Sequence, residues 1–245
     1  MSGDRRARIL SLLYQDHPGL HTDRLCQVCA EATGMSGAGI MLMSGDIARG
    51  SICTTDPVSA LIEDLQYLLG EGPCVDAYQS DQPVASPDLA RDPEGRWLAF
   101  SGAAVEAGAR AVFGFPLQIG AIRLGALNLH RDRPGSMTDE QHADALVLAE
   151  IAAQAVLLLQ ADAAPGEVAE ELERAADFRY VVHQASGMVA AQLGISVSQA
   201  LVRLRGRAFA DGRPLQHLAE DVVCRRVRYD PAADSEPDDS TGPGP

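Results

Sequence analysis

Two pairs of short apolar segments, each joined by a tight turn, limit the architectures open to this chain. Residues 110–119 and 122–131 are separated by only a glycine and an alanine, and their β-branched and aromatic content favours a β-hairpin. A second pair, 39–43 and a strand around 47–54, is joined through 44–46. Because strands joined by such short turns pair antiparallel, the pattern argues against a doubly wound parallel sheet.

Helical patterns surround these strands. A long helix is predicted from Thr138 to about Gln160, and Thr138 with Gln141 matches a capping box. A second helix, with its apolar residues at Leu61, Leu65, Leu68 and Leu69, is expected to end at Gly70. The remaining predicted elements are a helix at 21–33, a short strand at 84–85 and a helix at 94–107 that carries Trp97. The predicted class is α+β, an antiparallel sheet flanked by helices.

The C-terminal part is expected to be a separate, all-α unit. Residues 167–228 read as three short helices, of which the second starts at a Ser196–Gln199 capping box and the third has an apolar stripe from Leu215 to Val223. In the first helix, apolar residues alternate at spacings of four and three, which indicates pairing with a second copy. They are Val168, Leu172, Ala175, Val182, Val189 and Leu193.

Breaks in these patterns divide the chain into five segments. Pro165 and Gly166 interrupt two helical patterns and mark a linker at 163–166. The α+β domain is then 20–162, preceded by an N-terminal helical segment at 1–19. The all-α module is 167–228. The tail 229–245 is rich in Pro, Asp, Ser and Gly, and we expect this acidic segment to be disordered.

Charge is distributed unevenly over these segments. The whole chain has 20 basic residues, all of them arginine, against 34 acidic ones, a net charge of −14 that would repel nucleic acid. Residues 179–228 reverse the balance, with eight arginines and three acids. The absence of lysine excludes Schiff-base and P-loop chemistry. There is no apolar run long enough for a membrane span and no secretory signal pattern, so a cytoplasmic location is expected.

Two motifs in the α+β domain are similar to those of a known family. GEGPCVDAYQSDQPVASPDL at 70–89 and FGFPLQIGAIRLGALNLHRDRPG at 113–135 resemble an actinobacterial type of GAF domain, and the resemblance covers roughly 20–160. It implies a sensory domain with a six-stranded antiparallel sheet and a ligand pocket on one face. Such domains bind cyclic nucleotides, haem, bilins or other small molecules, and some only dimerise. The cofactor of this chain is unknown.

The all-α module at 182–223 resembles the ANTAR domain. The matching positions are Ala185, Gly187, Gly194, Ile195, Ser196, Ala200, Leu204, Arg205, Ala208, Leu215, Leu218, Ala219, Val222 and Val223. The resemblance implies a homodimer that binds stem-loops in a nascent transcript and prevents terminator formation. One position departs from the family, because Ser186 stands where relatives often have lysine.

Six residues of the module are candidates for RNA binding: Arg179, His183, Arg203, Arg205, Arg207 and Arg213. Arg203 and Arg207 are four residues apart and share one helix face, where they could follow phosphates. Arginine also stacks on unpaired bases. The alternative interpretation is a solvated helix face without a ligand.

The five cysteines are odd in number and scattered, so we expect no disulfide framework and a reducing compartment. Cys26 and Cys29 form a CxxC inside a helical pattern, which favours a buried helix face over a metal site. Cys74 lies at a predicted helix start, where a thiolate is stabilised. Cys53, Cys74 and Trp97 are therefore kept as a possible ligand or redox site, with simple burial of Cys74 as the favoured alternative.

The favoured hypothesis is a cytoplasmic antitermination regulator with a sensing or dimerising GAF domain. The alternative is a small-molecule or redox sensor whose C-terminal helices serve only dimerisation or protein contact. A third option, not favoured, is an enzyme, because a few GAF proteins reduce methionine sulfoxide with cysteines. No catalytic motif or metal-ligand spacing supports it.

Overall fold

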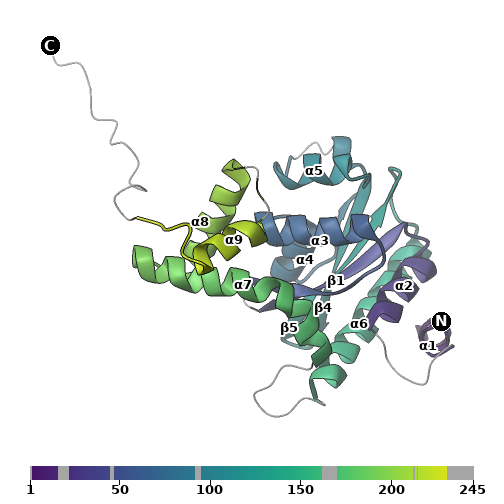
Figure 1. The fold of residues 1–245 in the computed structure, drawn as a ribbon. Coiled ribbons are helices and arrows are strands. Elements are labelled where there is room, and N and C mark those ends of the chain that lie inside the picture. Colours follow the sequence, from purple (N-terminus) through teal and green to yellow (C-terminus); the bar gives the residue numbers. More distant parts are fainter. Residues whose placement is uncertain are drawn as a thin grey trace. The chain divides into compact units, whose positions relative to one another are not determined.

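The computed structural model describes residues 2–15, 22–44, 47–91, 95–161, 170–211, 213 and 215–230. The chain forms two compact units, Met1–Phe178 and Arg179–Pro245, each treated by itself below (Figure 1). The predicted linker at 163–166 lies outside the described residues.

The first unit is built on an antiparallel sheet with strand order β2-β1-β5-β4-β3. Its strands are β1 (Gly37–Ser44), β2 (Ile47–Thr54), β3 (Val84–Ser86), β4 (Ala111–Ile119) and β5 (Ile122–Arg131). Both predicted strand pairs are confirmed, as β1–β2 and β4–β5. The GAF resemblance implied six strands, whereas the described residues form five.

Helices cover both faces of this sheet (Figure 1). Leu127 and Leu129 of β5 pack in the main core, whereas His130, the next residue along the strand, turns to the opposite face toward Ser59 of α3. The helices on the main-core face are α1 (Ser2–Leu13), α2 (Thr22–Thr33) and α6 (Asp139–Ala161), and those on the opposite face are α3 (Pro57–Leu69) and α4 (Pro73–Ser80). A short 3₁₀ turn, η1 (Leu89–Arg91), and α5 (Phe100–Glu106) complete the unit.

Ion pairs and caps hold these helices in place. Arg5 and Arg8 of α1 each donate to Asp144 of α6 at 2.7 Å, and Asp144 is buried. The predicted capping box of α6 is present, since the Gln141 N–H donates to Thr138 Oγ1 at 3.2 Å and the Thr138 N–H to Gln141 Oε1 at 3.0 Å.

Helix α3 ends as predicted, but its buried face differs from the leucine pattern. Gly70 has a left-handed φ of 69° and its N–H bonds to the carbonyl of Gln66, which closes the helix. Leu61 is 43% exposed, whereas its neighbour Ile62 is fully buried. Leu65 and Leu69 are half-buried and pack against a second apolar cluster, while polar residues of α3 turn toward the sheet, as described below.

The helix predicted at 94–107 begins only at Phe100. The N–H groups of Ala99 and Phe100 both donate to Glu71 Oε1 at 2.8 Å, so a carboxylate from a distant loop caps this helix. Trp97 precedes the helix and packs in a second apolar cluster with Phe100, at a ring-centroid distance of 5.8 Å. A cap supplied from 28 residues away in sequence cannot be recognised by local pattern.

The three helices predicted for the C-terminal part are present, the first of them beginning before the unit boundary at Arg179. They are α7 (Glu170–Leu193), α8 (Val197–Ala210) and α9 (Leu215–Val223). The Ser196–Gln199 capping box is present, and Ala200, Leu201, Leu204 and Ala208 form the buried face of α8. Val182 and Val189 of the α7 seam are buried, while the side chains of the earlier seam residues lie outside the described part.

By length and composition alone, two parts of the described chain meet the criteria for a membrane span. One is Asp139–Gln160 of α6, and the other is the pair Tyr180–Leu193 and Val197–Ala210 if this helix pair, bent by 105°, is taken as one span. Half of the α6 segment is buried inside the protein, which is what a core helix shows. No membrane span is therefore evident in the described residues.

Candidate functional site

The exposed side of α8 carries a cluster of arginines. Arg203 and Arg207 are exposed, and Arg205 is half-buried at the edge of the apolar face. All three lie on a helix without any acidic residue, VSQALVRLRGRAFA. The predicted common face of Arg203 and Arg207 is thus present on a helix that carries only positive charge.

Arg207 is held in position by two groups of its own unit. Its Nε lies 3.6 Å from Asp211 Oδ2, and its guanidinium lies 5.1 Å from the ring centroid of Tyr229. The Tyr229 N–H donates to Gln192 Oε1 at 2.8 Å, and Tyr229 is buried. Tyr229, which the sequence places at the start of the tail, therefore packs against the helical module.

Arg213 makes a structural ion pair. Its Nη2 lies 2.5 Å from Asp221 Oδ2 on α9, and Arg226 Nε lies 2.6 Å from the other oxygen of the same carboxylate. Hydrogen bonds from Arg213 and Arg226 lower the pKa of Asp221. A phosphate contact made by Arg213 would have to replace this pair.

The other two candidates for RNA binding, Arg179 and His183, lie on α7. His183 is half-buried, and the side chain of Arg179 lies outside the described part. Ser186 is fully buried and its hydroxyl donates to the Val182 carbonyl at 2.8 Å. The position where relatives often have lysine is thus an interior one in this chain, bonded within its own helix.

A buried polar cluster between α3 and the sheet was not predicted. We define it as Ser59, Glu63 and Gln66 of α3 with Asn128 and His130 of β5, each at most 3% exposed. The spacing of four and three along α3 places its three members on one face, a signal present in the sequence. Gly39 of β1 permits this packing, because a Cβ there would lie 2.9 Å from Glu63.

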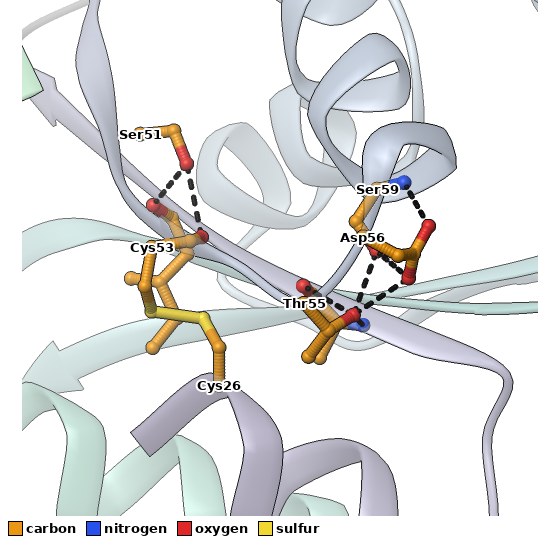
Figure 2. The surroundings of a disulfide bond; sticks show 8 residues. Cys26, Ser51, Cys53, Thr55, Asp56 and Ser59 are labelled. Atoms are coloured by element: carbon orange, nitrogen blue, oxygen red, sulfur yellow. Dashed lines mark hydrogen bonds between the residues drawn. A yellow bond between two sulfur atoms is a disulfide. The ribbon is translucent and has the colours of Figure 1, made fainter. Parts of the chain in front are cut away.

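The polar side chains near the start of α3 are well hydrogen-bonded, whereas in the described part of the chain the amide groups of Asn128 and Gln66 are not fully bonded. Asp56 caps α3 through the N–H groups of Val58 and Ser59, and its second oxygen accepts from the hydroxyls of Thr55 and Ser59 (Figure 2). Within the described residues, neither amide atom of Asn128 has a hydrogen-bond partner, nor does Gln66 Nε2. An unpaired buried amide costs about 1–3 kcal/mol, so this part of the cluster is suited to a small polar ligand or bound water.

Cys26 of α2 and Cys53 of β2 form a disulfide, with a Cα–Cα distance of 6.0 Å (Figure 2). The expectation that the cysteines stay unpaired is therefore wrong for these two. The antiparallel pairing of β2 with β1 turns Cys53 toward α2, a juxtaposition over 27 residues that spacing cannot reveal. The CxxC itself is split, because Cys29 remains a free, buried thiol.

The structure does not bring Cys53, Cys74 and Trp97 into one site. Cys53 lies in the main core, whereas Cys74 lies on the opposite sheet face, where its N–H donates to Gln66 Oε1 at 2.7 Å. Burial, reinforced by the charge of Glu63, raises the pKa of Cys74 well above its usual value. A thiolate at the start of α4 is therefore disfavoured, because desolvation outweighs the helix terminus. Burial, the favoured alternative, is confirmed.

These features define a class. The first unit is an α+β domain, an antiparallel sheet covered by helices on both faces with a buried polar cluster on one of them, and a helical unit with an arginine face follows it in the sequence. Residues 22–160 match the GAF domain family, and the chain belongs to that family. Residues 170–223 match the ANTAR domain.

The first unit is similar in fold to a solved structure. The GAF domain of a phosphoenolpyruvate-protein phosphotransferase from Coxiella burnetii is 15% identical, with a TM-score of 0.50, and covers 65% of this chain and 95% of its own. The corresponding domain from Acinetobacter is 14% identical, with a TM-score of 0.49, and the match covers 67% of this chain and 97% of that domain. No curated protein matches the chain significantly in sequence.

Proposed function

We propose that this protein is a cytoplasmic regulator of transcription antitermination that binds RNA through its ANTAR domain and receives a signal through its GAF domain. The observation that carries the proposal is the arginine face of α8, with Arg203 and Arg207 exposed on a helix that has no acidic residue. Such a face attracts phosphates although the whole chain has a net charge of −14.

The RNA-binding unit is proposed to be a homodimer that holds two stem-loops of a nascent transcript. The test is fluorescence anisotropy with the full chain and RNAs taken from transcripts that co-purify with it after crosslinking. An RNA with two stem-loops is expected to bind at least tenfold more tightly than either stem-loop alone, because the second contact is intramolecular. Absence of any enriched RNA at low salt would contradict RNA binding, and equal affinities would contradict the two-site arrangement.

The signal is proposed to be a small polar molecule bound at the cluster of Ser59, Glu63, Gln66, Asn128 and His130. The unpaired amide of Asn128 supports this, since it offers both a donor and an acceptor. Native mass spectrometry of the purified full chain is expected to show an added mass that is lost on denaturation and reduced in Asn128→Leu. A protein of bare chain mass that gains no mass from a cell extract would count against a ligand.

The disulfide favours a second candidate function for the GAF domain, redox sensing. Disulfides in cytosolic proteins are usually transient, catalytic or redox-sensing. Cys26–Cys53 connects a helix of the main core to β2, which ends the sheet order, so its reduction would release one contact of that strand. The stability experiment in the Discussion tests its premise.

A further inference from the structure

Helix α8 has an exposed apolar strip beside its arginines. Val202 and Phe209 are each 63% exposed, although they belong to the residue types most often buried. They are seven residues apart, two helical turns, and so lie on one side of the helix. The buried face formed by Ala200, Leu201, Leu204 and Ala208 points elsewhere, so the described packing of the unit does not account for the strip.

Gly206 lies between these two residues and is not explained by the unit's own packing. A Cβ at this position would meet no atom within 4 Å, and the backbone has no left-handed φ. Glycine in a helix interior is destabilising relative to alanine. Its effect here is to leave bare backbone between Val202 and Phe209, a flat place where a partner could approach closely.

The charge around the strip indicates the chemistry of that partner. Arg205 is one turn from Phe209, Arg203 follows Val202, and α8 contains no acidic residue. A partner that is anionic and also presents flat apolar faces matches an RNA loop, whose unpaired bases stack on aromatic side chains while its phosphates contact arginine. A protein partner would need a strongly acidic surface around an apolar centre.

We propose that the α8 strip, formed by Val202, Gly206 and Phe209, is the surface that contacts unpaired loop bases, with the Phe209 ring as the stacking platform. This inference rests on the proposed RNA binding. It adds that the loop is recognised through apolar base contacts, whereas the arginines bind the backbone.

The test uses the full chain and a pool of RNA hairpins with a constant stem and a randomised eight-nucleotide loop. Phe209→Leu, which keeps an apolar side chain but removes the ring, is expected to weaken binding about 5-fold to 100-fold. Phe209→Trp is expected to retain it. The dependence of affinity on salt is expected to stay unchanged, because no phosphate contact is lost. Leu98→Ala, at an apolar residue that is 87% exposed in the first unit, is the matched control.

Two further measurements separate the outcomes. Gly206→Ala is expected to raise the melting temperature and to weaken hairpin binding, whereas a purely structural role would give only the first effect. In a pool containing 5-bromouridine in the loop, ultraviolet crosslinks are expected to map to Phe209. Wild-type affinity in Phe209→Leu would overturn this inference alone. A changed oligomeric state of the Phe209→Leu protein in sedimentation would also overturn it, because the strip would then be a contact between protein copies. Failure of the wild type to bind any hairpin would overturn the proposed function as well.

Discussion

Replacing Arg203 and Arg207 together with alanine is expected to weaken binding of stem-loop RNA about 25-fold to 60-fold at 0.1 M salt. This follows from the loss of two phosphate contacts, each of which contributes about 0.7 to 0.9 to the slope of log affinity against log salt. The slope itself is expected to fall by about 1.4 to 1.8. Anisotropy titrations at four salt concentrations measure both quantities.

Charge-matched controls make this result specific. Arg91→Ala with Arg133→Ala removes the same charge from exposed positions of the first unit and is expected to change affinity little. Arg203→Lys with Arg207→Lys retains the charge and is expected to restore most of the binding. Because Arg207 also packs on Tyr229, the melting temperature of each variant is compared with that of the wild type. An unchanged affinity and slope in the double alanine variant would remove these two residues from the interface.

Breaking the Cys26–Cys53 disulfide is expected to lower the free energy of unfolding by about 3 kcal/mol. A bridge over 27 residues restricts the unfolded chain, and its removal restores that entropy. Urea unfolding of Cys224→Ser protein, with and without dithiothreitol, measures the difference and avoids pairing through the exposed thiol. The Cys26→Ala/Cys53→Ala protein provides an independent comparison. Superimposable curves would show that no such bridge contributes in solution.

Thiol labelling checks the same assignment residue by residue. In the native protein iodoacetamide is expected to label Cys224 rapidly, because it is exposed. Cys29 and Cys74 are expected to react slowly, since burial raises the pKa of Cys29 to about 12 and that of Cys74 well above its usual value. Cys26 and Cys53 are expected to label only after reduction and unfolding. Rapid labelling of Cys74 in the native state would contradict its buried position.

Short-range chemistry accounts for the part of this protein that could be predicted. The β4–β5 hairpin, the capping boxes at Thr138 and Ser196, the end of α3 at Gly70 and the buried face of α8 all depend on residues within a turn or two of each other. The exposed pair Arg203 and Arg207 follows from the same helical periodicity. The spacing Ser59, Glu63 and Gln66 carried an equally local signal that the leucine pattern obscured.

Contacts between distant segments decided the rest, because packing chooses among arrangements that local pattern leaves equally open. The pairing of β2 with β1 brought Cys53 to Cys26, and the approach of α3 to β5 buried Gln66 with Asn128. Glu71 caps the start of α5, Asp221 forms an ion pair with Arg213, and the guanidinium of Arg207 packs over the ring of Tyr229. Sequence periodicity thus defines which side of α8 carries positive charge, while only the folded unit shows that Val202 and Phe209 are left uncovered beside it.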